Sequence, residues 1–345
     1  MKKLTLFFAL LIWTVSFGEP PQDYTRIDEH ARNTPAKYAQ SVDKLAAYLI
    51  KPAKNDYEKV RSFYVWLAKN IAYDVDLFRR YKPGTSLQIG PEDVLKQRKA
   101  VCQGYADLFN ALCDEAGIES RLIPGYSRGF GNRDRKDFST ADHAWNSVLI
   151  NGQWYLLDAT WGAGGLDEKM QYRAEFNEKY FLAPPESFVE DHMPLQPMWQ
   201  LLDCPVSIKA FAAGDEAIQQ HVAESKNCIS FLDKISEFDA MPPADRELSA
   251  AEDAYLFNPD NHLVMARGYM DYAHDIMSGI KRQMSSRQEI EEAVDAQEEA
   301  LLYLMKAQRV LSKVRSGAEM EKDFVSKNIK NSEENLRSMK AVLQN

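Results

Sequence analysis

The sequence predicts an α+β fold in which a helix carrying a cysteine packs against an antiparallel sheet, followed by a wholly helical C-terminal domain. Residues 143–150 and 153–158 have the composition of two strands, and Asn151-Gly152 between them is the strongest short-range signal for a β-hairpin. Residues 102–116 keep the apolar spacing of a helix, and Gly117 ends it. From about residue 210 the chain changes to acidic, Met- and Ala-rich amphipathic patterns, which predict the helical domain.

The predicted hairpin brings a histidine and an aspartate together. A two-residue turn makes Ile150 face Gln153, so we expect His143 to pair with Thr160 and Asp158 to be its diagonal neighbour on the same face. Diagonal neighbours lie roughly 7–8 Å apart at the backbone, within reach of a side-chain hydrogen bond. An imidazole oriented by a carboxylate supplies two members of a nucleophilic triad.

Cys102 falls in the first turn of the predicted helix. Unpaired N–H groups and the positive end of the helix dipole favour a thiolate there, and Lys96, Arg98 and Lys99 add positive charge. The same backbone amides can stabilise a developing oxyanion. Cys102 is therefore the candidate nucleophile.

Each of these residues also has a purely structural alternative. A cysteine in an apolar helix is commonly a small buried hydrophobe, and this is our interpretation of Cys113. His143 alone could be a strand-end residue on the surface, and Asp158 alone a turn former. Cysteine with histidine can also bind a metal, but no Cys-x-x-Cys or His-x-x-x-His spacing supplies further ligands. We expect neither a metal nor another cofactor.

Three motifs resemble the transglutaminase-like superfamily, whose members have a papain-like α+β core. The motifs are Cys102-Gln-Gly-Tyr105, His143-Ala-Trp-Asn146 and Asp158-Ala-Thr-Trp161. The resemblance implies that Cys102 is the nucleophile, His143 the general base and acid, and Asp158 its orienting partner. The other motif residues that we expect to support the cleft are Gln103, Tyr105, Trp145, Asn146 and Trp161.

Flanking segments extend this resemblance to about residues 36–210. Residues 57–66 and 70–74 are similar to the helix that precedes the family core, and residues 180–188, 192–194 and 199–202 resemble the kyphoscoliosis-peptidase branch. One departure is Ala100, where relatives often have a glycine two positions before the cysteine. It puts the local backbone geometry in question, not the triad.

The N-terminus is typical of a secretory signal. Two lysines precede an apolar run over residues 4–13 that is too short to span a bilayer, and small residues follow up to Gly18. A retained membrane anchor is the alternative. We expect a signal over residues 1–18, a periplasmic or secreted mature protein, and no stable membrane insertion after cleavage. Of the four cysteines, the economical pairing joins Cys204 to Cys228 and leaves Cys102 and Cys113 as thiols.

A length of 345 residues predicts two domains, here a catalytic domain over 24–208 and a helical domain over 209–345. The net charge of −9 makes nucleic acid and anionic lipid poor candidates as partners. The C-terminal helices should bury their apolar stripes against one another, with a groove for a protein partner as the alternative. One predicted stripe consists of Ile290, Val294, Leu301, Met305 and Leu311.

The expected function is exported, thiol-dependent acyl transfer on protein or peptide amides through a Cys-His-Asp triad. Hydrolysis by a peptidase or amidase is favoured because water is always present, whereas transfer to an amine needs a second, dry site. The alternatives are a cross-linking protein-glutamine transglutaminase and a non-catalytic binding module. We also expect residues 127–142, which run directly into His143, to line the rim of the cleft.

Overall fold

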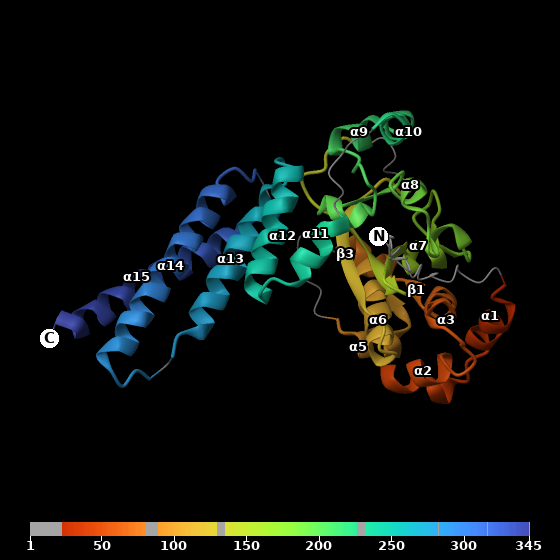
Figure 1. The fold of residues 1–345 in the computed structure, drawn as a ribbon, viewed down its shortest axis with the longest axis horizontal. Helices are drawn as coiled ribbons and strands as arrows, with labels where there is room; N and C mark the ends of the chain where they lie inside the picture. The colour runs from red at the N-terminus through yellow and green to blue at the C-terminus, as the bar shows by residue number, and fades with distance from the viewer. Residues whose placement is uncertain are drawn as a thin grey trace, which may run out of the picture.

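The computed structural model describes residues 23–80, 89–129, 135–225, 232–281, 283–315 and 317–344. The predicted secretory signal lies outside these residues. Figure 1 shows two parts, a sheet covered by helices and an arm of long helices that extends away from it. This is the predicted fold class, an α+β core followed by a helical C-terminal region. The limits of the two predicted domains remain a prediction.

A four-stranded antiparallel sheet forms the centre of the first part. Its strands lie in the order β5 (Gln153–Leu157), β4 (His143–Ile150), β3 (Ser120–Ser127) and β8 (His192–Pro194). Ile150 pairs with Gln153, which confirms the predicted hairpin register. Asn151 and Gly152 take φ values of 53° and 79°, as a two-residue turn of this kind requires.

The hairpin is shorter than predicted at its open end. The last pair joins Asn146 to Leu157, so the expected pairing of His143 with Thr160 is wrong. His143 instead pairs with Gly125 on β3. Beyond Leu157 the chain leaves the sheet and enters α7 (Ala159–Ala163).

Helix α6 (Cys102–Glu115) begins and ends close to the predicted positions, and Gly117 beyond it has a φ of 68°. It packs against β3 and β4, with α2 (Val42–Leu49) and α3 (Asp56–Asn70) also in contact with it. Its buried apolar face consists of Tyr105, Leu108, Phe109, Leu112 and Cys113. Since burial of apolar surface is the main driving force of folding, this face fixes the helix that carries Cys102.

Shorter elements complete the first part. The helices are α1 (Thr25–Arg32), α4 (Val75–Arg80), α5 (Pro91–Gln97) and α8 (Pro185–Phe188), and single 3₁₀ turns are η1 (Ala36–Tyr38), η2 (Glu178–Tyr180) and η3 (Pro197–Gln200). Two small strand pairs are parallel β1 (Ala72–Tyr73) with β2 (Lys99–Ala100), and antiparallel β6 (Gly164–Leu166) with β7 (Tyr172–Ala174). The pairing of Tyr73 with Ala100 holds the segment just before Cys102.

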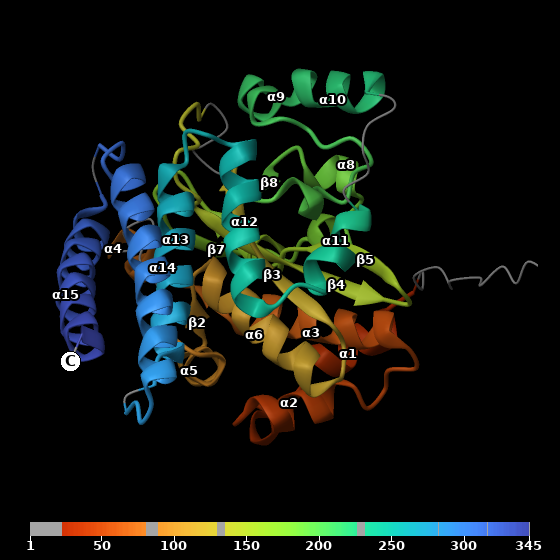
Figure 2. The same ribbon diagram turned by 60° about the vertical axis from the view of Figure 1, so that its left-hand side comes forward.

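Seven helices follow the sheet among the described residues: α9 (Ile208–Ala213), α10 (Asp215–Glu224), α11 (Leu232–Asp239), α12 (Pro243–Phe257), α13 (His262–Gly279), α14 (Arg287–Leu311) and α15 (Glu319–Gln344). Helices α12 to α15 each pack on the next, and Figure 2 shows them side by side. Across the parts of the chain that the structure describes, none of the helices combines the length and apolarity needed to cross a bilayer.

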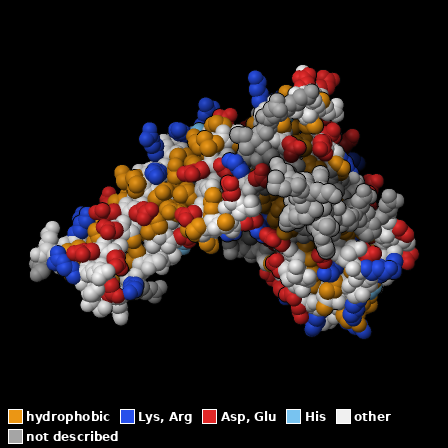
Figure 3. Space-filling view, in the orientation of Figure 1, with side chains coloured by type: hydrophobic (Ala, Val, Ile, Leu, Met, Phe, Trp, Pro, Cys, Tyr) orange, Lys and Arg blue, Asp and Glu red, His pale blue; other side chains and the backbone are white. Residues whose placement is uncertain are grey.

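The predicted stripe on α14 is only partly correct. Val294 and Leu311 are buried, but Met305 is 54% exposed. The face that packs against neighbouring helices centres on Ala293, Ala300, Leu304, Ala307 and Leu311. Figure 3 shows hydrophobic side chains interspersed with charged ones along this arm. The exposed large apolar residues of the arm are Leu256, Leu302, Met305, Met320, Phe324 and Val342.

Candidate active site

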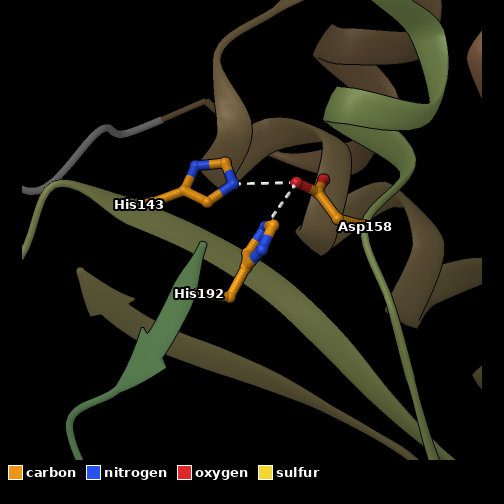
Figure 4. Close-up of side chains that lie close together, drawn as sticks. All are labelled: His143, Asp158 and His192. Carbon is orange, nitrogen blue, oxygen red and sulfur yellow. Dashed lines mark hydrogen bonds and ion pairs between the residues drawn. The ribbon is translucent and has the colours of Figure 1, made fainter. Parts of the chain in front are cut away.

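Asp158 reaches His143 from the start of a helix. It is the N-cap of α7, and its Oδ1 accepts hydrogen bonds from the backbone N–H groups of Thr160 at 2.7 Å and Trp161 at 3.2 Å. Its Oδ2 lies 2.8 Å from His143 Nε2 (Figure 4). The predicted His–Asp contact is therefore present, but Asp158 makes it as a helix cap and not as a cross-strand neighbour.

Cys102 is the first residue of α6, and its thiol is free and half-buried. Its thiol lies close enough to His143 to contribute to the raised pKa of that imidazole. Because Nε2 of that ring faces Asp158, Nδ1 is the nitrogen left for the thiol. The N-cap residue of α6 is Val101, which offers no side-chain acceptor, so the first-turn N–H groups beside Cys102 have no side-chain cap. The structure thus brings Cys102, His143 and Asp158 together.

The pKa values of the imidazole and the carboxyl move in opposite directions. Burial lowers the pKa of His143, but the charge of Asp158 and the hydrogen bonds to Asp158 and Cys102 outweigh burial, so this pKa lies well above its usual value. Burial raises the pKa of Asp158, but the charges and hydrogen bonds of His143 and His192 hold it well below its usual range. The pair therefore favours an ionised carboxylate beside a protonated imidazole.

His192 is a further residue of the site that the sequence analysis did not single out. It is the first residue of β8 and is completely buried. Its Nε2 lies 3.1 Å from Asp158 Oδ2, the same oxygen that binds His143, and its Nδ1 lies 2.6 Å from Asp191 Oδ1. The signal available in the sequence was its place at the start of residues 192–194, one of the segments that resemble the kyphoscoliosis-peptidase branch.

Two of the predicted cleft-supporting residues lie against the imidazole rings. Trp161 stacks on His143 with ring centres 5.2 Å apart, and its ring centre is 4.4 Å from that of His192. Trp145 lies edge-on to His192 at 5.0 Å. These rings surround the two imidazoles with apolar surface, which lowers the local dielectric constant and strengthens their hydrogen bonds.

The other three predicted residues hold helix α6 in place. Tyr105 donates its hydroxyl to the carbonyl of Ile71. Asn146 donates to the carbonyl of Ala106 at 3.1 Å and to Asn110 Oδ1 at 2.8 Å. Gln103 donates to Asp107 at 3.1 Å within the same helix. Tyr105 and Asn146 therefore anchor the helix that presents Cys102, and Gln103 makes only a local contact.

The same cluster contains atoms that could hold a metal ion. Among the described residues, His143, Asp158 and His192 form a group whose potential ligand atoms all lie within 4.8 Å of one another. Both ring nitrogens, however, are at hydrogen-bonding distance from one carboxylate oxygen, and the other nitrogen of His192 already faces Asp191. A zinc ion would have to replace these bonds with ligand distances of about 2.0–2.2 Å. We therefore interpret the cluster as a hydrogen-bonded network.

The states of the other cysteines are consistent with a free thiol at Cys102. Cys113 is a free, fully buried thiol, and burial raises its pKa. Cys204 is disulfide-bonded, and its predicted partner Cys228 lies outside the described residues.

The C-terminal end of the segment that leads into His143 is hydrogen-bonded to strand β3. Asp142 accepts a hydrogen bond of 2.9 Å from the backbone N–H of Ser127, and its own N–H donates to Gly125 at 3.0 Å. Residues 130–134 lie outside the described residues, so the predicted role of residues 127–142 at the cleft rim stays a prediction.

Residues 43–159 match the family described as the transglutaminase-like superfamily. This part of the chain is a transglutaminase-like domain, and its similarity to two kyphoscoliosis peptidases supports the kyphoscoliosis-peptidase branch. The resemblance read from the three motifs is thereby confirmed.

Two curated relatives and one solved structure illustrate the match. The chain is 38% identical over 192 residues to kyphoscoliosis peptidase of Homo sapiens, covering 55% of this chain and 28% of that protein. It is 28% identical over 208 residues to hillarin of Drosophila melanogaster, covering 55% of this chain and 24% of the relative. The chain thus spans between 24% and 28% of the length of these relatives. A Cytophaga hutchinsonii structure, described provisionally as a cysteine protease, aligns with a TM-score of 0.27 and 27% identity over 39% of this chain and 42% of that one.

Proposed function

We propose that this protein transfers acyl groups from protein or peptide amides through Cys102, with water as the usual acceptor, and so acts as a peptidase or amidase. One observation carries the proposal: His143 lies 2.8 Å from the buried carboxylate of Asp158 and is close enough to the Cys102 thiol for that thiol to help raise its pKa. A nucleophile, a base within hydrogen-bond reach and a group that orients the base are the parts that this chemistry needs.

The first half of the reaction forms a thioester. His143 takes the proton of Cys102, and the thiolate sulfur attacks the amide carbonyl carbon. The first-turn N–H groups of α6 are placed to stabilise the oxyanion, because no side chain caps them. As the C–N bond breaks, His143 gives its proton to the departing amine.

The second half regenerates the enzyme. His143 removes a proton from water, the resulting hydroxide adds to the thioester, and the C–S bond breaks to release the carboxylic acid. The sulfur leaves as the Cys102 thiolate, which pairs with protonated His143 or takes its proton back. Asp158 stays ionised throughout and keeps the His143 ring oriented. If a lysine amine replaces water in this half, the product is an isopeptide bond and the activity is that of a transglutaminase.

We further propose that the protein acts outside the cytoplasm. The disulfide at Cys204 supports this location, since structural disulfides persist mainly in oxidising compartments. The N-terminal pattern of charged, apolar and small residues points in the same direction.

Thiol alkylation tests the proposed nucleophile. Iodoacetamide is expected to label Cys102 faster than an ordinary thiol at the same pH, because His143 can accept the proton of the thiol. His143→Ala should slow that labelling, and buried Cys113 serves as an internal control that stays unlabelled in the folded chain. Equal, slow labelling of both proteins would indicate a binding module without catalytic function.

Incubation with casein, with and without a fluorescent amine, separates the reactions. Peptide fragments indicate hydrolysis, and incorporation of the amine into casein indicates transfer. Cys102→Ala must abolish either outcome. Persistent cleavage by Cys102→Ala would overturn the proposal.

A further inference from the structure

His192 bonds carboxylates, which sets it apart from His30, His221 and His262; the last of these bonds the Tyr255 hydroxyl. His30 and His221 each bond a backbone carbonyl, at 2.9 Å and 3.0 Å, as a histidine with a structural role commonly does. His192 instead lies between two carboxylates, with Asp158 on Nε2 and Asp191 on Nδ1. One of these carboxylates is the partner of His143, so His192 is one hydrogen bond away from the proposed catalytic base.

The orientation of Asp158 depends on donors from three elements. Two backbone N–H groups of α7 bind Oδ1, while His143 from β4 and His192 from β8 both bind Oδ2. Figure 4 shows the two rings approaching this oxygen from different sides. A carboxylate with both oxygens held in this way cannot rotate about its Cβ–Cγ bond without breaking bonds that are buried and expensive to lose.

His192 is itself held rigidly. Asp191 Oδ2 accepts from Lys179 Nζ at 2.8 Å and from the Tyr180 hydroxyl at 3.1 Å, so the carboxylate on Nδ1 is anchored to η2. Phe188 stacks on the His192 ring with centres 4.1 Å apart and an angle of 24°. Ring packing and hydrogen bonds on both nitrogens leave the imidazole one orientation.

We propose that His192 is a positioning residue, which holds Asp158 Oδ2 in line with His143 and so fixes His143 against Cys102. The inference rests on the proposed acyl-transfer function. The charged groups around His192 are Asp191 on its own segment, Asp158 at α7, His143 on β4 and Lys179 on η2. Loss of the His192 N–H leaves Oδ2 with a single donor, which allows His143 to move. A displacement of about 1 Å in such a site costs about 10²-fold in rate.

The test compares rates of Cys102 alkylation by iodoacetamide in the full chain, followed by mass spectrometry of the labelled peptide. His192→Phe fills the aromatic surroundings without a donor, and it is expected to slow labelling by about 10- to 100-fold. His192→Gln keeps an N–H donor for Asp158 and should recover most of the rate. His221→Gln removes a histidine that bonds only a carbonyl, and it should label like the wild type. Protection of Cys113 reports an intact fold in each variant.

Each outcome decides one of the two proposals. If His143→Ala slows labelling but His192→Phe does not, the positioning role is wrong and the proposed function stands. If His192→Gln is as slow as His192→Phe while Cys113 stays protected, the donated N–H is not what matters, and the inference fails. If Cys102 is labelled at the wild-type rate in His143→Ala, the proposed function is wrong, and the positioning role of His192, which depends on it, is wrong as well. Should Cys113 become reactive in His192→Phe, His192→Met replaces it as the apolar variant in the same comparison.

Discussion

Asn258, just after α12, donates hydrogen bonds of 2.7 Å both to the hydroxyl of Tyr126 on β3 and to the backbone carbonyl of Phe138. Asn261 adds a bond of 2.8 Å to the same hydroxyl. Tyr126 directly follows Gly125, which pairs with His143, and Phe138 lies in the segment that leads into His143. The helical arm is therefore attached to the sheet next to the candidate active site.

Asn258→Ala is expected to lower the free energy of unfolding by about 1–3 kcal/mol, because it leaves the buried Phe138 carbonyl without a donor and removes one of the two bonds to the Tyr126 hydroxyl. Equilibrium urea unfolding measures the change. Asn328→Ala is the matched control, since Asn328 bonds only the Phe324 carbonyl on an exposed face of α15, and its effect should stay within about 0.5 kcal/mol. Equal effects of the two substitutions would show that the buried contact does not stabilise the attachment.

The stability of the protein should depend on pH through Asp158 and His143. The pKa of Asp158 is lowered in the folded state, so its contribution is present above its unfolded value of about 4 and is lost as the pH falls further. The pKa of His143 is raised, so its contribution is present below its unfolded value of about 6.5 and is lost as the pH rises through the folded value.

Asp158→Asn removes both contributions and tests them together. The gap in the free energy of unfolding between the wild type and this variant should be largest at about pH 4–6.5 and should narrow on either side. Urea unfolding of both proteins from about pH 3 to pH 8 measures the gap. A gap that stays constant from about pH 3 to pH 8 would contradict the assigned shifts.

Lys179 and Asp191 should contribute unequally, although they form one ion pair. The Lys179 side chain is 41% exposed, so Lys179→Met is expected to cost less than about 1 kcal/mol of unfolding free energy. Asp191 is buried and accepts from His192 and Tyr180, so Asp191→Ala should cost about 1–3 kcal/mol. Urea unfolding at neutral pH compares the two variants. Similar costs would indicate that Asp191 stabilises the fold mainly through its ion pair with Lys179 and not through its bonds to His192 and Tyr180.

The parts of this site that local chemistry dictates could be predicted from the sequence. Asn151-Gly152 fixes the hairpin register because both residues adopt a positive φ, and the apolar spacing of α6 identifies the helix and its buried face. The register correctly predicted that His143 and Asp158 lie close together. It did not predict that Asp158 reaches His143 from the N-cap of α7. The strand ends before Asp158 because the side chain of Asp158 caps α7. The alternation of apolar and polar residues does not distinguish an aspartate that caps a helix from one that continues a strand.

The contacts that tertiary packing creates could not be predicted. His192 lies 34 positions from Asp158 in a three-residue strand, which is too short to show a period. On α14, the helices approach through Ala293, Ala300 and Ala307, whereas the larger apolar residues suggested a stripe that included exposed Met305. Small residues permit close helix contact but give a weak hydrophobic signal.

Close packing behind Asp158 yields the last prediction. A Cβ on Gly162 in α7 would lie 2.2 Å from the Tyr64 hydroxyl and 2.4 Å from the adjacent ring carbon. Tyr64 cannot yield, because it is fully buried and donates to the Asn177 carbonyl at 2.6 Å. Gly162→Ala must therefore shift α7 and, with it, the capping residue Asp158.

We expect Gly162→Ala to cost about 1–3 kcal/mol of unfolding free energy, as overpacked interiors do, and to slow alkylation of Cys102. Gly165→Ala, three residues along in β6, is the matched control, because nothing lies within 4 Å of its added methyl group, and it should change stability by no more than about 0.5 kcal/mol. Urea unfolding and the rate of Cys102 labelling are measured on both variants. If Gly162→Ala destabilises the fold yet labels at the wild-type rate, α7 does not set the position of His143, and the orienting role of Asp158 is wrong.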